Sequence, residues 1–323
     1  MPAPHGPAAP TQGWRTCVGA WTISAATAPT RPRSWSATTP TWLTTWIASP
    51  TVQSPPPVRG APTSQKGRVS VIARNAETRP DTDGQLIYVV GDVHGRFDLM
   101  LALLGKIVAD SRERALGRRP IVIFCGDYVD RGPDSAKVME AVIQLRRRTD
   151  IDVRLLKGNH EQAMLDFLRE PVEAAGWLRF GGAETLASYG VALEGGLMAE
   201  SLISARDQLL ENMPAPHLHL LHTLELMLVV GAYAVVHAGV RPGVALEHQA
   251  EQDLLWIRDP FLDHDGAFDK IIVHGHTWAG PRPNREPHRI GVDTGAYQTG
   301  VLTAVRLDGP DVVFLQAELT QDD

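Results

Sequence analysis

The chain is predicted to adopt an α/β fold in which two β-sheets pack face to face and helices cover their outer sides. Strand-like and helix-like segments alternate from residue 85 to about 170, which favours a largely parallel sheet. A second run of β-rich apolar segments follows between residues 224 and 319. With 323 residues and 43% hydrophobic content, the chain is long enough to bury such a core.

Residues 1–80 differ in composition from the rest, and residues 81–323 are expected to form one folded domain. The first 76 residues hold seven Lys and Arg but no acidic residue, and the segment is rich in Thr, Ser, Pro and Ala. It has no helical or strand periodicity, so we expect a disordered or wrongly assigned extension. An organellar transit peptide or a weak secretory signal is the alternative, because transit peptides are Arg-rich and acid-poor.

Three strand–loop–helix units open the predicted domain. The strands are expected at residues 85–90, 121–125 and 153–156, each followed by apolar residues at helical spacing. A more helical segment over about 171–216 looks like an insertion that caps a site. A tight hairpin at Gly231-Ala232 and strands beginning at residues 271, 289, 301 and 312 complete the chain.

Five short motifs, most of them directly after these apolar runs, carry metal-ligand side chains: GDVHG, GDYVDRG, GNHE, HAG and HGHT. A single Asp-x-His pair is a weak signal. The signal is strong when polar side chains from five strand ends meet at one edge of the sheets. A carboxylate at that edge can bridge two cations roughly 3.5 to 4 Å apart. The candidate ligands are Asp92, His94, Asp127, Asn159, His237 and His276.

The mixture of carboxylate and imidazole predicts which metals fit. Such ligands suit Mn²⁺, Fe or Zn²⁺ better than Ca²⁺ or Mg²⁺, which prefer oxygen alone. Two divalent ions are therefore expected, with Mn²⁺ preferred and Fe or Zn²⁺ as alternatives.

These motifs, in this order and at these separations, resemble the phosphoprotein phosphatase family of calcineurin-like metallophosphoesterases. The resemblance covers about residues 86–319. It implies a four-layer αββα sandwich with a dinuclear metal centre. It also implies that the first metal is held by Asp92, His94 and Asp127, and the second by Asp127, Asn159, His237 and His276.

The remaining motif residues have the chemistry to cleave a phosphomonoester. A hydroxide held by the two metals would attack phosphorus. His160 could protonate the leaving alkoxide, and Asp130 could aim that imidazole. Arg131 offers a two-pronged clamp for phosphate oxygens, Asn159 is expected to contact the substrate too, and the resemblance adds Arg258 as a second cationic arm.

The predicted function is a serine/threonine protein phosphatase of bacterial type, acting on a phosphoprotein or phosphopeptide. The alternative enzyme is a symmetrical diadenosine tetraphosphate hydrolase. Those relatives usually lack the aspartate found here at Asp130 and carry Asp at the position of Glu161, which favours the protein phosphatase. A more remote alternative is a non-catalytic phosphate-binding scaffold, although all six ligand positions retain ligand chemistry.

Charge and composition argue against other partners. The net charge of the chain is −6, and the seven Lys and Arg of the first 76 residues leave about −13 for the other 247 residues. A domain this acidic repels a phosphate backbone, which disfavours nucleic-acid binding. The uncharged run over residues 34–58 holds too much Thr, Ser and Pro for a membrane span. Cys17 and Cys125 form no disulfide framework, so a reducing, cytoplasmic location is expected, and a monomer.

Of three further signals, two are assigned to structure rather than to function. The histidines at 217, 219 and 222 are expected to be partly exposed, without a metal, because residues two apart on a helix face different ways. Arginines 146–148 are expected to end a helix. For Trp177 and Trp278 two interpretations stay open, a wall of the substrate groove or packing in the core or at its rim.

Overall fold

The computed structural model describes residues 81–318 of the chain. The predicted disordered extension, residues 1–80, lies outside the described residues, as do residues 319–323. The proposed domain boundary near residue 80 therefore stays a prediction. Among residues 81–318, no helix is both long enough and apolar enough to cross a bilayer.

The first sheet is mixed, with strand order β10-β9-β1-β2-β3. The strands are β1 (Leu86–Val90), β2 (Ile121–Phe124), β3 (Asp152–Leu155), β9 (Val301–Asp308) and β10 (Asp311–Glu318). The three early strands run parallel, as the alternating pattern predicted. The last two strands, β9 and β10, were expected to belong with the second run of strands. Instead, β9 pairs antiparallel with the free edge of β1, and β10 pairs with β9.

The second sheet has the order β4-β5-β6-β8-β7. The strands are β4 (Met227–Val230), β5 (Tyr233–Val236), β6 (Ile271–His274), β7 (Asn284–Arg285) and β8 (Arg289–Gly291). The predicted hairpin is confirmed, since β4 and β5 are antiparallel and joined at Gly231. Because β5, β6 and β8 are parallel, their carboxyl ends share one edge. The two-residue edge strand β7 was not predicted.

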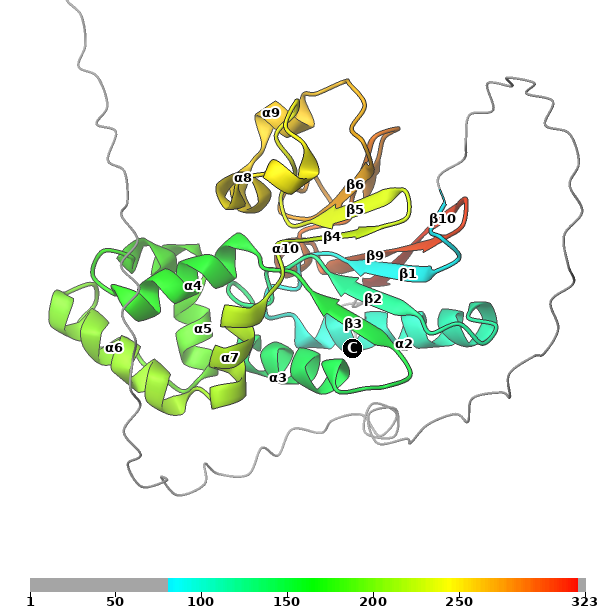
Figure 1. The fold of residues 1–323 in the computed structure, drawn as a ribbon. Coiled ribbons are helices and arrows are strands. Elements are labelled where there is room, and N and C mark those ends of the chain that lie inside the picture. The colour runs from blue at the N-terminus through cyan, green and yellow to red at the C-terminus, as the bar shows by residue number, and fades with distance from the viewer. Residues whose placement is uncertain (1–80, 319–323) are drawn as a thin grey trace, which may run out of the picture. The chain divides into compact units, whose positions relative to one another are not determined.

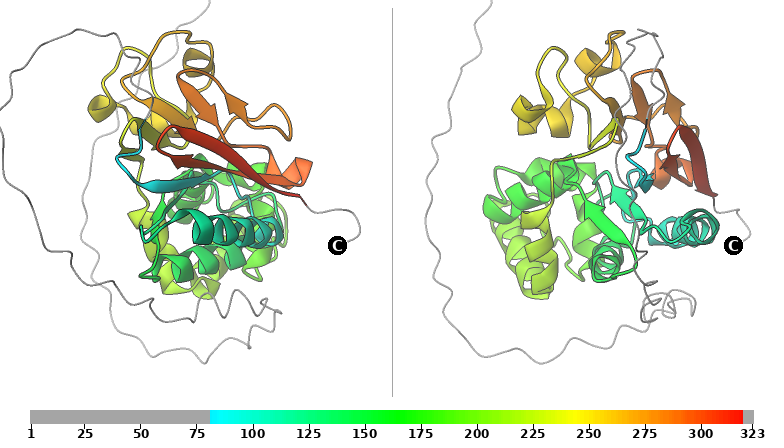
Figure 2. Two further views of the ribbon diagram at one scale, coloured as in Figure 1. Left: turned by 90° about the vertical axis from the view of Figure 1, so that its right-hand side faces the viewer. Right: turned by 45° about the vertical axis from the view of Figure 1, so that its right-hand side comes forward.

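Alternate residues of each central strand enter different layers, which builds the predicted αββα sandwich. In β1, Tyr88 faces the core shared with helix α2 (Phe97–Arg114) and helix α3 (Ser135–Arg146), and Val89 faces the second sheet. In β5, Val235 packs between the sheets and Val236 packs under α8 (Glu251–Trp256) and α9 (Asp259–Leu262). Figures 1 and 2 show these helices on the two outer sides. A strand buried on both faces needs this continuous apolar sequence.

The capping insertion is helical, as predicted, and lies beside α3 (Figure 1). Its elements follow α4 (Asn159–Arg169) and are η1 (Ala175–Phe180), α5 (Gly182–Ser188), α6 (Ala199–Asn212) and α7 (Ala215–Thr223). Its buried residues, among them Leu186, Leu202 and Leu221, join the core beneath the first sheet. The insertion is therefore packed into the domain rather than appended to it.

One expectation about the insertion was wrong. His217 is buried instead of partly exposed, and its ring lies between the Tyr189 hydroxyl at 2.8 Å and the Glu140 carboxylate at 3.1 Å. Glu140 comes from α3, 77 residues away in sequence, so no local pattern could indicate this partner. The contacts satisfy both ring nitrogens and explain the burial without a metal.

Gly91 is expected to be required for the contact between the two sheets. A Cβ at this position would lie 2.4 Å from the backbone oxygen of Val292, which follows β8. Replacing Gly91 by alanine should lower the free energy of unfolding by about 2–3 kcal/mol, because backbone must shift to admit the methyl group. Urea unfolding measures it. Gly280→Ala, at a position with nothing near, is the control, and equal effects of the two changes would contradict this packing.

Candidate functional site

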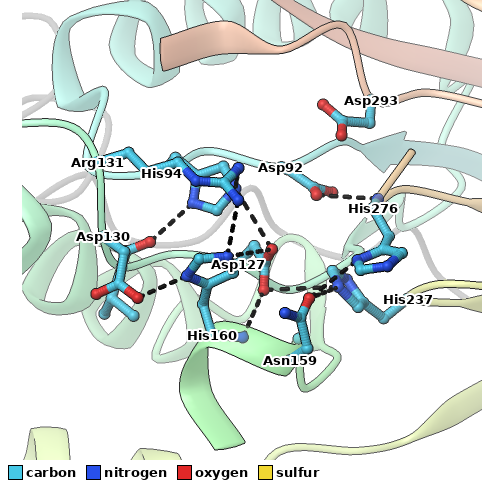
Figure 3. A network of polar contacts seen from close by, with 12 residues as sticks. Asp92, His94, Asp127, Asp130, Arg131, Asn159, His160, His237, His276 and Asp293 are labelled. Atoms are coloured by element: carbon cyan, nitrogen blue, oxygen red, sulfur yellow. Dashed lines mark hydrogen bonds and ion pairs between the residues drawn. The ribbon is translucent and has the colours of Figure 1, made fainter. Parts of the chain in front are cut away.

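The six candidate ligands lie just after strands that end at one edge of the sandwich. Asp92 and His94 follow β1, Asp127 follows β2, and Asn159 opens α4 after β3. His237 follows β5 and His276 follows β6, so the second sheet contributes as well. All six are buried, and Figure 3 shows their side chains facing one another.

The backbone at this edge is strained. Five of the seven non-glycine residues with positive φ among residues 81–318 belong to the site, namely His94, Asp127, Asp130, Arg131 and His276. Each costs about 1–3 kcal/mol and persists only where surrounding contacts over-determine it. The sharp turns aim successive side chains at a common point.

Asp127 stands at the centre of the group. One of its oxygens lies 3.4 Å from His94 Nε2, and the other lies 3.6 Å from His237 Nε2. Two sets of side chains bring ligand atoms within 4.8 Å of one another, and Asp127 belongs to both. The sets are His94, Asp127 and His160, and Asp127, His237 and His276.

The tautomers of two histidines leave ligand lone pairs facing inward. His94 Nδ1 donates to the carbonyl of Val129 at 2.9 Å, and His237 Nδ1 donates to that of Cys125 at 2.8 Å. A carbonyl can only accept, so Nε2 of each ring carries the lone pair. Burial lowers the pKa of His94 to about 3 and also lowers that of His237, which keeps the rings neutral.

The arrangement around Asn159 fits a cation. Its Oδ1 lies 2.8 Å from His237 Nε2 and 3.0 Å from His276 Nδ1. Burial lowers the pKa of His276 to about 2. Because His237 Nε2 carries a lone pair, the Asn159 oxygen and the His237 nitrogen are two acceptors at hydrogen-bond distance. A shared positive ion relieves that repulsion, so the residues present fit a divalent metal.

Asp92 lies beside this group rather than in either set of ligand atoms. Its Oδ2 accepts the backbone N–H of His276 at 2.9 Å, and its buried Oδ1 has no hydrogen-bond partner. Burial, followed by the nearby charge of Asp293, raises the pKa of Asp92 well above its usual value. Two buried carboxyls side by side need a proton or a cation between them. The role of Asp92 as a metal ligand stays a prediction.

His160 and Asp130 form a buried pair. Asp130 Oδ2 lies 2.6 Å from His160 Nδ1, and the two side chains are 0% and 5% exposed. Burial acts to lower the pKa of His160, but the charges of Asp127 and Asp130 raise it above its usual value. A protonated, oriented imidazole has what a general acid needs.

Arg131 and Arg258 both contact imidazoles of the site. Arg131 places Nη1 2.8 Å from His94 Nε2 and Nη2 3.0 Å from His160 Nε2, and its guanidinium lies 4.5 Å from the centre of the Tyr297 ring. Arg258 Nε lies 3.2 Å from His276 Nε2. A cation on His94 or a proton on His160 would need the lone pair that Arg131 occupies. The guanidinium must therefore turn away when either is present.

Glu161 supports the strained loop after β2 through hydrogen bonds to its backbone. Its carboxylate accepts the backbone N–H groups of Asp127 and Tyr128 at 2.8 Å, Gly158 at 2.9 Å and Val129 at 3.3 Å. Burial and then the charge of Asp127 raise the pKa of Glu161 to about 7, and hydrogen bonds from the backbone oppose that rise. Glu161 thus links the second motif to the third.

Sequence reasoning missed several residues that touch the site. Asp293 follows β8 just as Asp92 follows β1, so the strand-end pattern could have indicated it. Tyr297, in the same segment, packs its ring against His94 and stands near Trp278, which therefore lies at the rim of the site. Thr185 contacts Asp130 from the insertion, and no local signal marks it. Trp177 was singled out as a groove wall or core residue, but its hydrogen bond to Asp130 was not expected.

Comparison with known proteins identifies the family. A model of the calcineurin-like phosphoesterase family matches residues 86–296, and the chain belongs to that family. Serine/threonine-protein phosphatase 1 of Salmonella typhimurium is 28% identical over 228 residues, which are 68% of this chain and 91% of that protein. An asymmetrical bis(5'-nucleosyl)-tetraphosphatase, PrpE of Bacillus subtilis, is 27% identical over 259 residues, 73% of this chain and 96% of that protein.

A solved structure, assigned provisionally as a diadenosine tetraphosphatase, superposes with a TM-score of 0.50 and covers 73% of this chain and 96% of that one. Its sequence identity is 18%, so the likeness concerns the fold alone. Together with the family match, it agrees with the two-sheet architecture predicted from the motifs.

Replacing Glu161 by glutamine is expected to destabilise the domain. The amide nitrogen cannot accept the backbone N–H groups that face it, which should cost about 2–3 kcal/mol. Urea unfolding of the metal-free protein measures this loss. Glu170→Gln, at an exposed position at the end of the same helix, should change stability by less than about 0.5 kcal/mol. Equal stabilities of the two variants would refute the supporting role.

Proposed function

We propose that the chain is a metal-dependent phosphomonoesterase that removes phosphate from serine and threonine residues of proteins. The observation that carries this proposal is the buried Asp130–His160 pair beside the ligand cluster. Membership of the calcineurin-like phosphoesterase family supplies the phosphoester chemistry. What the pair adds is a proton donor suited to the departing group.

The leaving group decides whether such a donor is needed. Serine and threonine leave as alkoxides, which are strong bases and require a proton as the P–O bond breaks. A nucleotide released from a dinucleotide polyphosphate leaves as a phosphate anion, a weak base that departs without help. An aimed imidazolium therefore favours an alkyl phosphomonoester. His160 is assigned as the acid and Asp130 as the residue that aims it.

The metals would be held by the six strand-end residues. Asp127 belongs to both sets of ligand atoms, which supports a bridging role. Asp92 and His94 would complete one site, and Asn159, His237 and His276 the other. Two divalent ions, Mn²⁺ by preference, would lower the pKa of a bound water to near neutrality. They would also offset the negative charge of the phosphate oxygens.

The remaining groups would bind and orient the phosphate. Arg131 is poised beside His160, and its guanidinium is free to clamp phosphate oxygens once it leaves the imidazoles. Arg258, beside His276, would reach the same group from the opposite side. Asn159 contributes its amide N–H. We further propose a phosphoprotein as the partner, a monomeric state and a cytoplasmic location.

A second candidate is the hydrolysis of dinucleoside tetraphosphates. It is favoured by PrpE of Bacillus subtilis, which matches this chain at nearly the same identity as the Salmonella protein phosphatase. The two activities share a metal centre and differ in the group that departs. Substrate comparison therefore separates them.

Asp127→Ala is expected to abolish the hydrolysis of aryl phosphates in Mn²⁺, because it removes the shared ligand. His160→Ala is expected to abolish that of phenyl phosphate, because the basic phenolate needs the acid to depart. Chelation of metal from the unaltered protein should abolish turnover as well, and added Mn²⁺ should restore it. Turnover and bound metal are measured together. Asp263→Ala and His219→Ala, at exposed positions, are the controls. Unchanged turnover in Asp127→Ala would refute the assigned site.

The kcat/KM for a phosphoserine peptide is expected to exceed that for diadenosine tetraphosphate by at least about tenfold, a difference near 1.4 kcal/mol in transition-state stabilisation. The comparison is made in parallel with Mn²⁺, Fe²⁺ and Zn²⁺. A reversed ratio with every metal would assign the chain to dinucleotide hydrolysis instead.

A further inference from the structure

Asp130 receives hydrogen bonds from the capping insertion as well as from His160. Trp177 Nε1, in η1, donates to Asp130 Oδ2 at 2.7 Å, the same oxygen that accepts His160 Nδ1. Thr185 Oγ1, in α5, donates to Asp130 Oδ1 at 2.7 Å. All four side chains are buried. The two oxygens of the carboxylate are thus held by three donors from three elements.

The hydroxyls behind Asp130 fix its backbone too. Its N–H lies 2.9 Å from Thr185 Oγ1 and 3.0 Å from Ser135 Oγ, and these two hydroxyl oxygens are 3.0 Å apart. Thr185 has one hydrogen, which it gives to the carboxylate, so Ser135 must donate to Thr185. Thr185 therefore contacts both the side chain and the backbone of a residue whose φ is 75°.

Two glycines allow close packing here, Gly181 against the second motif and Gly182 against Trp177 within the insertion. A Cβ on Gly181 would lie 2.4 Å from the backbone nitrogen of Arg131, and a Cβ on Gly182 would lie 2.4 Å from the indole of Trp177. The Gly181 carbonyl accepts the Arg131 N–H at 3.3 Å. The insertion thus touches both residues of the strained Asp130–Arg131 step.

We propose that Trp177 and Thr185 are positioning residues that set the direction of the Asp130 carboxylate and, through it, of the His160 imidazole. The inference rests on the proposed function, in which His160 protonates the leaving group. With only His160 as partner, the carboxylate could rotate about its Cβ–Cγ bond and carry the imidazole with it. The donors from the insertion prevent that rotation.

The test compares two aryl phosphates that differ in how much they need the acid. Phenyl phosphate releases a basic phenolate, and para-nitrophenyl phosphate releases a stable one that departs unaided. Thr185→Val and Trp177→Phe should lower kcat for phenyl phosphate about tenfold or more, and that for para-nitrophenyl phosphate by no more than about twofold. Thr185→Ser keeps the hydroxyl and should restore the original ratio of the two rates.

A double-mutant cycle checks that the effect runs through Asp130. Adding Thr185→Val to Asp130→Asn should cause no further loss on phenyl phosphate, since the carboxylate to be aimed is absent. Tyr189→Phe is the matched control, because it removes a buried hydroxyl of the same insertion that bonds to His217 instead. It should leave the ratio of rates unchanged.

The outcomes separate this inference from the proposed function. His160→Ala should itself give a large, leaving-group-dependent loss, and a uniform loss there would remove the acid role and with it the positioning role. If His160→Ala behaves as expected but Thr185→Val and Trp177→Phe slow both substrates equally, or neither, only the inference is overturned. Bound metal is measured in every variant, and loss of metal with an equal fall on both substrates also counts against positioning.

Discussion

The interaction on which the site depends is that of a buried carboxylate with the imidazoles around it. Burial acts to raise the pKa of Asp127, and positive charge on the four histidines around it would hold that pKa well below its usual value. Three of those histidines have their own pKa values lowered, mainly by burial, so they provide lone pairs rather than charge. A charged acid among neutral bases attracts cations strongly. The fold supplies that environment by ending strands of both sheets at one edge.

Such an environment is maintained by contacts that oppose local strain. The turns after β1, β2 and β6 hold non-glycine residues at positive φ, which an isolated loop would not retain. Glu161 binds the N–H groups of the second motif, and the Asp127 carbonyl accepts two N–H groups of the first. Each motif is therefore a support for another. Loss of one motif's contacts would therefore displace ligand residues of other motifs, although these lie far apart in sequence.

Much of this arrangement could be predicted from sequence because its signals are local. Asp92, Asp127 and Asn159 follow short apolar runs, and parallel strands bring such positions together whatever the rest of the chain does. Their position at one edge of the sheet was therefore predictable, and in the structure they follow β1, β2 and β3. The pairing of β9 with β1 was not, since it depends on which sheet edge remains free.

The hydrogen-bond partners of buried polar groups could not be predicted from local sequence patterns either. His217 is satisfied by Glu140 from another helix, and Asp130 by Trp177 and Thr185, which lie 47 and 55 residues further along the chain. Trp177 packs on Phe167 in the core and also donates to the carboxylate. The sequence-based alternatives of core packing or groove wall did not include that polar role.

The close packing of Gly181 and Gly182 has a consequence for how this family could diversify. An insertion beside a functional site is a natural place for new specificity to arise. Here the same segment abuts Arg131 and carries Trp177, and α6 buries Leu202 in the core beneath the first sheet, so the insertion is constrained along its length. An exchange of the insertion would therefore replace the hydrogen-bond partners of Asp130 along with the outer surface of the segment.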